Sequence, residues 1–307
     1  MSSFKASLKM LAFVLWSIVL VPPQMLILAF HKGKHAYAIP FLWENGVRTI
    51  FQIRYTIEGV PLRGHQVFYM SNHLSYLDVP LLGSILPASF LAKSEVKNWP
   101  VFGFLSKLQQ TEFIERKRTA IASETGKLAE KIANGRSLIL FPEGTSTSGY
   151  EVEPFKSSLF TLALGSGNED IFLQPVTISL LKVGGKVPAT KDERDLYAWP
   201  RDLDMELPPH LFRFAKTSGA DLRVTFHQPV RAQAIAHGQR GLCHPYQRAR
   251  LDAHRTHLRG TRDVRRLVEN RRRRDEDVGR RARHTAQPVL AGVPGIAIER
   301  AGPHERS

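Results

Sequence analysis

His73 and Asp78 are the residues of this chain whose types and spacing best suit proton transfer. A neutral histidine can take a proton from an alcohol near neutral pH, and a carboxylate on its other ring nitrogen fixes the tautomer and the orientation of the ring. His73 and Asp78 are candidates for such a pair. The same pair of residue types also arises by chance, in which case it would form only a surface hydrogen bond.

The chain between these two residues is predicted to be partly non-helical. Five residues of an ideal α-helix rotate through about 500°, which leaves the two side chains about 140° apart. Pro80 is tolerated best in the first turn of a helix, so the helix is expected to begin near Asp78 or Val79. His73 then lies on the loop that precedes the helix.

The predicted base has no serine or cysteine nucleophile in a recognisable context. The Gly-x-Ser-x-Gly pattern of hydrolases does not occur in the sequence. A base without a nucleophile from the protein indicates that the substrate supplies the attacking group. The histidines show no metal-ligand spacing, and no metal site is predicted.

A second polar loop contains Glu143, Gly144 and Thr145, which follow the apolar run 137–141. Glycine permits a close approach of the backbone, and hydroxyl groups with free amides can bind polar oxygens. On its own this segment also fits an ordinary turn after a strand. Because ligands of open α/β sheets bind at the carboxyl ends of the strands, we expect this loop to lie near His73.

The elements that carry both loops alternate between strands and helices. Strands are predicted at the apolar or alternating segments 51–57, 67–70, 137–141, 171–179 and 222–226, and helices over 121–134 and from about Pro154. This alternation is typical of an α/β fold with a mostly parallel sheet flanked by helices. A chain of 307 residues favours one such domain with appendages, and we assign it to residues 41–230.

Residues 1–40 are predicted to anchor the chain in a membrane. The segment 10–30 contains no charged residue, and lysines lie on both sides of it. About 20 residues would just cross a bilayer, but Pro22-Pro23 at the centre disfavours a straight helix. A straight span and a bent pair of helices in one leaflet therefore both stay open. A cleaved signal peptide is a third alternative, although the apolar run is longer than is usual for one.

The formal net charge of +15 indicates an anionic partner, and most of this charge lies near the C-terminus. Residues 231–307 contain 18 Arg and no Lys, Phe or Trp, against eight Asp or Glu. This composition predicts a disordered basic tail that binds anionic lipid or nucleic acid, or has no specific role. A further hypothesis is a frame-shifted sequence, because GC-rich DNA read out of frame yields mainly Arg, Ala, Gly, Pro and His. The single cysteine, Cys243, fits a reducing compartment.

The His-x4-Asp and Phe-Pro-Glu-Gly-Thr strings together resemble the signature of the 1-acyl-sn-glycerol-3-phosphate acyltransferases, a family also called lysophosphatidic acid acyltransferases. The order and spacing of the two strings agree with that family, and the resemblance extends over about residues 51–230. It implies that His73 is the general base and that Asp78 supports it. It also implies that Glu143, Gly144 and Thr145 contribute to substrate binding.

Three cations match further family positions near the polar head of the substrate. The segment 113–116 is similar to a family element that implies phosphate binding by Arg116, although Gln110 stands where the family has glycine. A guanidinium suits phosphate because it donates two parallel charge-assisted hydrogen bonds. Lys93 and Lys156 also match family positions, and an ordinary surface role stays open for all three cations. Residues 197–199 resemble another recurring string of the family.

The resemblance implies a reaction in phospholipid biosynthesis. A fatty acyl group would pass from acyl-CoA or acyl carrier protein to the sn-2 hydroxyl of lysophosphatidic acid, giving phosphatidic acid. The acyl thioester is a substrate, and no cofactor is expected. Alternative acceptors are glycerol-3-phosphate and a lyso-aminolipid. A membrane-anchored nucleic-acid-binding module is an alternative of another class, but the basic tail lacks interleaved aromatic residues.

The expected location is the cytoplasmic face of the inner membrane, with the segment 10–30 as the anchor. A lysolipid and its product reside in the bilayer, so the two polar loops must lie at its surface. Basic residues of the chain would favour anionic membrane lipid.

Overall fold

The computed structural model describes residues 3–114, 136–150, 153 and 171–232. All of them belong to one compact unit, Met1–His257. The predicted helices over 121–134 and from Pro154, and the basic tail from residue 233, lie outside the described residues. The described chain continues past the expected domain end at residue 230, because Arg231 pairs with Phe172 and Ala232 is buried.

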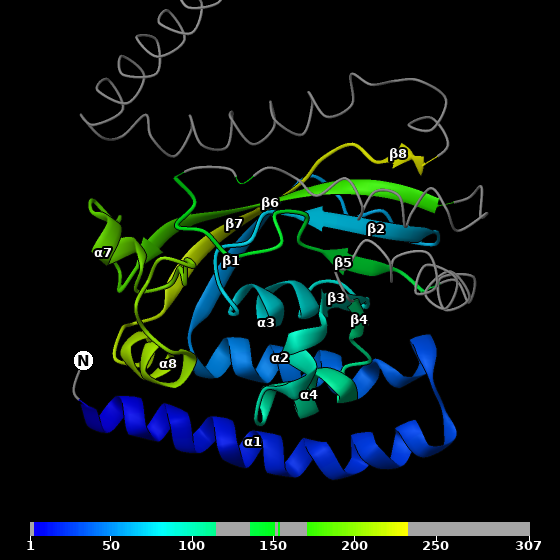
Figure 1. Ribbon diagram of the computed structural model, residues 1–307, viewed down its shortest axis with the longest axis horizontal. Coiled ribbons are helices and arrows are strands. Elements are labelled where there is room, and N and C mark those ends of the chain that lie inside the picture. Colours follow the sequence, from blue (N-terminus) through cyan, green and yellow to red (C-terminus); the bar gives the residue numbers. More distant parts are fainter. Residues whose placement is uncertain (1–2, 115–135, 151–152, 154–170, 233–307) are drawn as a thin grey trace, which may run out of the picture. The chain divides into compact units, whose positions relative to one another are not determined.

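An eight-stranded sheet forms the centre of the described chain (Figure 1). Its strands are β1 (Ile53–Glu58), β2 (Gln66–Ser71), β3 (Ser89–Lys93), β4 (Glu112–Ile114), β5 (Leu138–Leu140), β6 (Ile171–Val183), β7 (Ala220–Phe226) and β8 (Val230–Arg231). The strand order is β1-β7-β6-β2-β5-β3-β4, and β8 pairs with β6. The five predicted strands are confirmed, and the short strands β3, β4 and β8 are additional.

The central part of the sheet is parallel. β4, β3, β5, β2 and β6 run in the same direction, so the carboxyl ends of β2 and β5 lie at the same edge. β7 and β8 run antiparallel to β6, and β1 runs parallel to β7. The predicted α/β fold with a mostly parallel sheet is confirmed. All six residues of β2 are buried, as is typical of a central parallel strand.

The longer helices lie together on one side of the sheet (Figure 1). In that view α3 lies nearest to the sheet, α2 lies below it, and α1 runs along the outer side. The helical elements are α1 (Ser3–Phe30), η1 (Gly33–Ala36), α2 (Ala38–Ile50), α3 (Asp78–Gly83), η2 (Ser94–Asn98), α4 (Phe102–Leu108), α7 (Lys191–Arg194) and α8 (Leu207–Ala215). The expected boundary between residues 40 and 41 falls inside α2, so the anchor segment and the α/β domain share this helix.

α1 is one continuous helix that passes through Pro22-Pro23. Pro22 and Pro23 lack the backbone N–H groups that would bond to the carbonyls of Ile18 and Val19, respectively. The two prolines and the two residues with these carbonyls are all exposed. The missing hydrogen bonds therefore lie on the side of the helix that packs against nothing in the described chain. A helix can bend at such a position while its buried face stays packed. α1 is long and apolar enough to cross a membrane.

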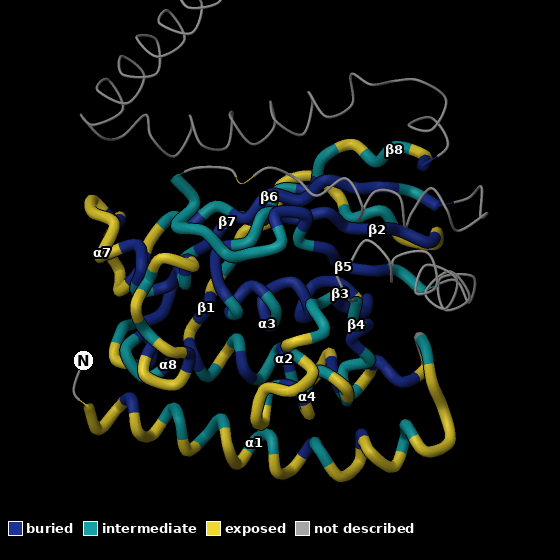
Figure 2. The backbone as a smooth tube through the Cα atoms, in the orientation of Figure 1, coloured by how far each residue is buried: buried dark blue, intermediate teal, exposed yellow. Residues whose placement is uncertain are grey.

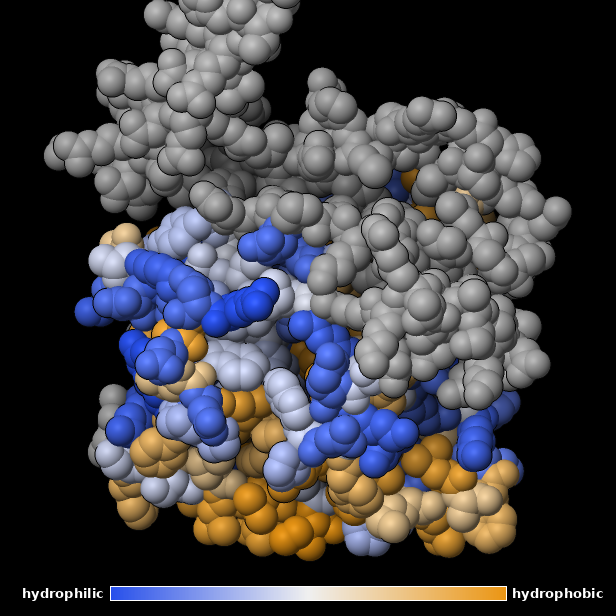
Figure 3. Space-filling view, viewed as in Figure 1, coloured by the Kyte–Doolittle hydropathy of each residue, from blue (hydrophilic) through white to orange (hydrophobic). Residues whose placement is uncertain are grey.

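α1 packs against the domain along its length. Lys9 Nζ donates to Thr217 O at 3.0 Å, and Gln24 Nε2 donates to Leu108 O at 2.8 Å. The opposite face of α1 is exposed and apolar (Figures 2 and 3). Its exposed large side chains are Phe4, Leu8, Leu11, Val14, Leu15, Ile18, Val19, Met25, Leu26 and Phe30. This exposed set is called the outer face of α1 below.

Candidate active site

The loop that carries His73 leaves the sheet where β2 ends at Ser71. The next residue, Asn72, takes the place of a further strand residue beside β6. Its side-chain Nδ2 donates to Ile178 O at 2.9 Å, and its side-chain Oδ1 accepts from Ile178 N at 2.7 Å. These two bonds satisfy the backbone of β6 beyond the end of β2 and fix the direction of the loop.

The chain from residue 72 to residue 77 is not helical, and α3 begins at Asp78. Pro80 lies in the first turn of α3, where its missing N–H has no helical acceptor to lose. The predicted break between His73 and Asp78 is therefore confirmed. It allows the imidazole to turn back toward the start of the helix, where His73 Nδ1 lies 3.0 Å from Asp78 Oδ2.

The carboxylate of Asp78 is completely buried and is held by four hydrogen bonds. Oδ2 accepts from His73 Nδ1 and from the backbone N–H groups of Leu74 at 2.6 Å and Ser75 at 2.9 Å. Oδ1 accepts from the hydroxyl of Tyr197 at 2.9 Å. These donors compensate for the loss of water around the charge.

Tyr197 is a permanent donor to this carboxylate. Burial, together with the negative charge of Asp78, raises the pKa of Tyr197 well above its ordinary value. Its phenol therefore stays protonated throughout the physiological range. Since Asp78 can only accept, His73 Nδ1 carries the proton of the neutral ring, and His73 Nε2 presents the lone pair of a base.

An aromatic stack holds the imidazole plane. The ring of Phe141 lies parallel to that of His73, with the two centroids 4.0 Å apart and an angle of 19° between the planes. Phe90 of β3 stacks on the other side of Phe141 at 6.2 Å. The His73 side chain keeps 19% of its surface exposed, so a substrate can reach it.

The loop after β5 contacts the backbone of His73. Glu143, which is 2% exposed, accepts from His73 N at 3.2 Å through Oε1 and from Glu153 N at 3.3 Å through Oε2. Thr147 N donates to His73 O at 2.9 Å. Gly144 has a φ of 70°, which favours glycine at this turn. The two predicted polar loops therefore meet at one edge of the sheet.

The remaining predicted site residues are placed less directly. Thr145 is half-buried in the same loop as Glu143. Lys93 ends β3 at the carboxyl edge, where it pairs with Ile114 of β4. Arg116 and Lys156 lie outside the described residues, so their predicted roles stay predictions.

A second buried histidine fixes the neighbouring Tyr76. His210 Nε2 donates to the carbonyls of Asp195 at 2.9 Å and Ala198 at 3.1 Å, and its Nδ1 accepts from the hydroxyl of Tyr76 at 2.9 Å. Burial lowers the pKa of His210, which favours the neutral ring that these contacts require. This histidine joins α8 to the loop that carries the base.

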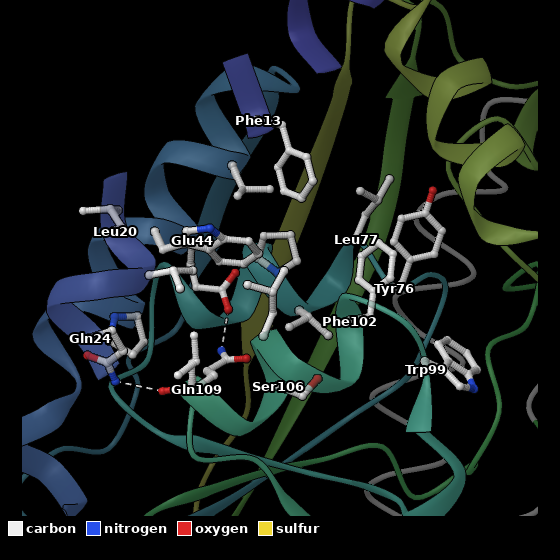
Figure 4. A pocket seen from close by; sticks show the side chains of 18 of the residues that line it. Phe13, Leu20, Gln24, Glu44, Tyr76, Leu77, Trp99, Phe102, Ser106 and Gln109 are labelled. Atoms are coloured by element: carbon white, nitrogen blue, oxygen red, sulfur yellow. Dashed lines mark hydrogen bonds between the residues drawn. The ribbon is translucent and has the colours of Figure 1, made fainter. Parts of the chain in front are cut away.

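An apolar cavity of about 170 Å³ lies beside the loop (Figure 4). Tyr76 and Leu77 line it next to the base. The other lining side chains come from α1, α2, α3, η2, α4 and α8, and examples are Phe13, Trp43, Pro80, Trp99, Phe102 and Leu211. A cavity of this composition can hold a hydrocarbon chain beside Tyr76 and Leu77, which belong to the same loop as His73.

Three residues of this arrangement are not evident from the chemistry of the two strings alone. Tyr197 lies in a string that resembles the family, but its hydrogen bond to Asp78 spans 119 positions of the chain. Asn72 precedes the base, yet its partner Ile178 belongs to another strand. Glu44 is a buried carboxyl that lines the cavity, and its only signal in the sequence is a carboxylate on the apolar face of the segment 38–50.

Comparisons with known proteins agree with this geometry. Residues 52–179 match the family model described as Acyltransferase. The chain is 35% identical over 224 residues to a lyso-ornithine lipid O-acyltransferase of Brucella abortus, which covers 71% of this chain and 82% of that relative. It is 32% identical over 167 residues to a 1-acyl-sn-glycerol-3-phosphate acyltransferase of Neisseria meningitidis, with 54% of this chain and 61% of that relative covered.

The fold is similar to the crystal structure of the 1-acyl-sn-glycerophosphate (LPA) acyltransferase PlsC from Thermotoga maritima. The TM-score is 0.52 at 18% identity, and the match covers 86% of this chain and 98% of that chain. This similarity shows the fold, and the sequence relatives place the protein in the class of lipid acyltransferases. The chain belongs to the acyltransferase family that includes the 1-acyl-sn-glycerol-3-phosphate acyltransferases.

Proposed function

We propose that the protein transfers a fatty acyl group from an acyl thioester, either acyl-CoA or acyl carrier protein, to the hydroxyl group of a lyso-lipid. The observation that carries this proposal is the His73–Asp78 pair beside an apolar cavity. His73 Nε2 is the free nitrogen of a ring whose other nitrogen is held by a buried carboxylate. The cavity lined by Tyr76 and Leu77 of the same loop suits an acyl chain rather than a polar substrate.

The reaction needs one base and no nucleophile from the protein. His73 Nε2 takes the proton of the lyso-lipid hydroxyl while that oxygen attacks the thioester carbonyl. The carbon–sulfur bond then breaks, and the imidazolium returns the proton to the leaving thiolate, which departs as a thiol. Asp78 stabilises the imidazolium between these steps. General-base assistance of this kind contributes about 10²- to 10⁴-fold to the rate.

A lyso-ornithine lipid is the acceptor that we favour. The relatives named lyso-ornithine lipid O-acyltransferase from Brucella abortus and Rhizobium meliloti are matched over 82% and 75% of their length. The relatives from the two Neisseria species, named 1-acyl-sn-glycerol-3-phosphate acyltransferase, are matched over 61%. Similarity over a larger share of the enzyme supports the lyso-aminolipid as acceptor. Lysophosphatidic acid is the second candidate, because Arg116 matches the phosphate-binding position of the family.

The outer face of α1 supports a location on one leaflet of a membrane. The attachments of Lys9 and Gln24 lie 15 residues apart on α1, which is about 22 Å along the helix. A helix held to the domain over that length cannot cross the bilayer while the domain stays in water. We therefore favour α1 lying in the membrane surface with its apolar outer face in the lipid. The cytoplasmic face and anionic lipid as partner stay part of the proposal.

An acceptor panel tests the proposed function. The purified full chain in detergent micelles is given radiolabelled hexadecanoyl-CoA with lyso-ornithine lipid, lysophosphatidic acid or glycerol-3-phosphate, and the lipid product and free thiol are measured. We expect the highest kcat/KM with lyso-ornithine lipid and a rate at least about 100-fold lower with His73→Ala. A higher value with lysophosphatidic acid would assign the second candidate. Transfer to none of the acceptors, with acyl-CoA or acyl carrier protein, would refute the proposed reaction.

A further inference from the structure

The apolar cavity has one polar end, which the proposed reaction does not use. Figure 4 shows Glu44, Gln24 and Gln109 gathered on one side of the cavity, and Tyr76 and Trp99 on the other side. Tyr76 belongs to the loop that carries His73. The polar group is therefore separated from the base by the apolar part of the cavity.

The carboxyl group of Glu44 is 1% exposed and only half satisfied. Its Oε1 accepts a hydrogen bond from Gln109 Nε2. Its Oε2 has no hydrogen-bond partner among the described residues. α3 approaches this side chain closely, because a Cβ added at Gly83 would lie 2.9 Å from Glu44 Cγ. Gly83 of α3 and Gln109, which directly follows α4, thus hold the carboxyl group in place.

Gln24 of α1 shows the same pattern. It is 3% exposed, and its Nε2 donates to the carbonyls of Ala36 at 3.2 Å and Leu108 at 2.8 Å. These two bonds orient the amide. Within the part of the chain that the structure covers, its Oε1 has no partner. Figure 4 shows this oxygen on the side of Gln24 that is turned away from Glu44, so Glu44 Oε2 is the oxygen that remains for a group in the cavity.

We propose that the cavity binds a hydroxylated fatty acyl chain and that Glu44 recognises its hydroxyl group. This inference rests on the proposed function, which places an acyl chain in the cavity. A hydroxyl group can accept one hydrogen bond and donate another, whereas the methylene and methyl groups of a plain chain can do neither. A plain chain would leave Glu44 Oε2 desolvated, at a cost that a hydroxylated chain removes.

The protonation of Glu44 fits this role. Burial raises the pKa of its carboxyl group to about 8, against the opposing effect of the Gln109 hydrogen bond. At neutral pH the group is therefore mainly an uncharged acid with one O–H donor. Such a group can donate to a chain hydroxyl without placing a negative charge beside hydrocarbon.

Matched acyl chains test the inference on the purified full chain in detergent micelles. In the first arm, hexadecanoyl-CoA competes with positional isomers of hydroxyhexadecanoyl-CoA for one lyso-lipid acceptor. In the second arm, hexadecanoyl-CoA acylates lysophosphatidic acids whose own chain is plain or hydroxylated, because the sn-2 hydroxyl accepts the acyl group in both. The two arms distinguish the donor chain from the acceptor chain as the source of the hydroxyl. We expect at least one isomer in one arm to have a kcat/KM about tenfold above that of its plain counterpart.

Four variants identify the group that reads the hydroxyl. Glu44→Gln keeps a donor and an acceptor, and should retain the preference. Glu44→Leu and the unbranched Glu44→Met remove both the donor and the acceptor. They should lower the kcat/KM for the hydroxylated chain to that for the plain chain or below it. Ser106→Ala is the matched control, because it removes a half-buried hydroxyl from the same cavity and should leave the preference unchanged.

Two outcomes would overturn the inference. One is that wild-type protein transfers or accepts plain chains at least as well as every hydroxylated isomer in both arms. The other is a preference that persists in Glu44→Leu or Glu44→Met. In both cases transfer of plain hexadecanoyl still occurs, so the proposed function stands. If wild-type protein transfers no acyl group to any lyso-lipid, the proposed function and this inference both fail.

Discussion

Glu44→Gln is predicted to change how the stability of the protein depends on pH. The pKa of this carboxyl group is about 8 in the folded chain, mainly because of burial, against 4.5 in the unfolded chain. Between these two values the folded protein binds a proton that the unfolded chain has released. The free energy of unfolding therefore falls as pH rises from 4.5 to 8, by about 1.4 kcal/mol per pH unit. Below pH 4.5 this contribution is fully present.

The structure gives the size of the effect. From pH 5 to pH 8 the wild-type protein should lose about 4 kcal/mol of stability through this group alone. Glutamine has nearly the same size as glutamate and can still accept from Gln109, but it does not titrate. Relative to wild type, Glu44→Gln should therefore gain about 4 kcal/mol of unfolding free energy between pH 5 and pH 8. For a domain of this size that is roughly 10 °C in Tm.

Thermal unfolding, followed by tryptophan fluorescence in one detergent at pH 5, 6, 7 and 8, measures this difference. Other titrating groups change both proteins equally and cancel in the comparison. Glu206→Gln is the control, because residue 206 is exposed and makes no side-chain capping bond at the start of α8. Its Tm at the same four pH values shows the effect of removing an exposed carboxyl group. Parallel pH curves for wild type and Glu44→Gln would refute the reasoning.

Four further variants test the site, the family position of Arg116 and the outer face of α1. His73→Ala should lower kcat at least about 100-fold in the thiol-release assay, and a retained rate would show that another group is the base. Tyr197→Phe leaves Asp78 Oδ1 without its donor, so we expect a loss of about 1 to 3 kcal/mol in unfolding free energy and a lower kcat, rather than a higher KM. Arg116→Ala should mainly raise the KM for lysophosphatidic acid, and an unchanged value would remove this residue from the phosphate site. Ile18→Asp on the outer face of α1 should release the protein from vesicles in a flotation assay while its activity in micelles persists; unchanged flotation would contradict the proposed membrane contact.

The geometry of the base could be predicted because it depends on local rules. Helical periodicity excludes a continuous helix between His73 and Asp78, and Pro80 marks where the helix can start. Strands β2 and β5 at the site are also evident from short sequence patterns, since the predicted segment 67–70 of β2 is a continuous apolar run and the whole strand is buried. In each case neighbours in the chain determine the structure.

The partners of these residues could not be predicted in the same way. The contact of Tyr197 with Asp78, and that of Asn72 with Ile178, join segments more than 100 positions apart. No periodicity links such residues, because their distance depends on how the whole sheet is ordered. The polar end of the cavity is a similar case, since Glu44 is recognisable in sequence only as one carboxylate in an otherwise apolar helix face.

α1 shows why the anchor and the enzyme are one structure. Its inner face supplies Phe13, Leu20 and Gln24 to the cavity wall, while its outer face is apolar and exposed. Burying that outer face in lipid is favourable by roughly 25 cal/mol for each Å² removed from water. The same helix therefore carries the apolar face that we propose lies in the membrane and also forms part of the cavity wall. Removing residues 3–30 would take away that face and open the cavity lined by Tyr76 and Leu77, so the truncated chain should lose activity rather than become a soluble enzyme.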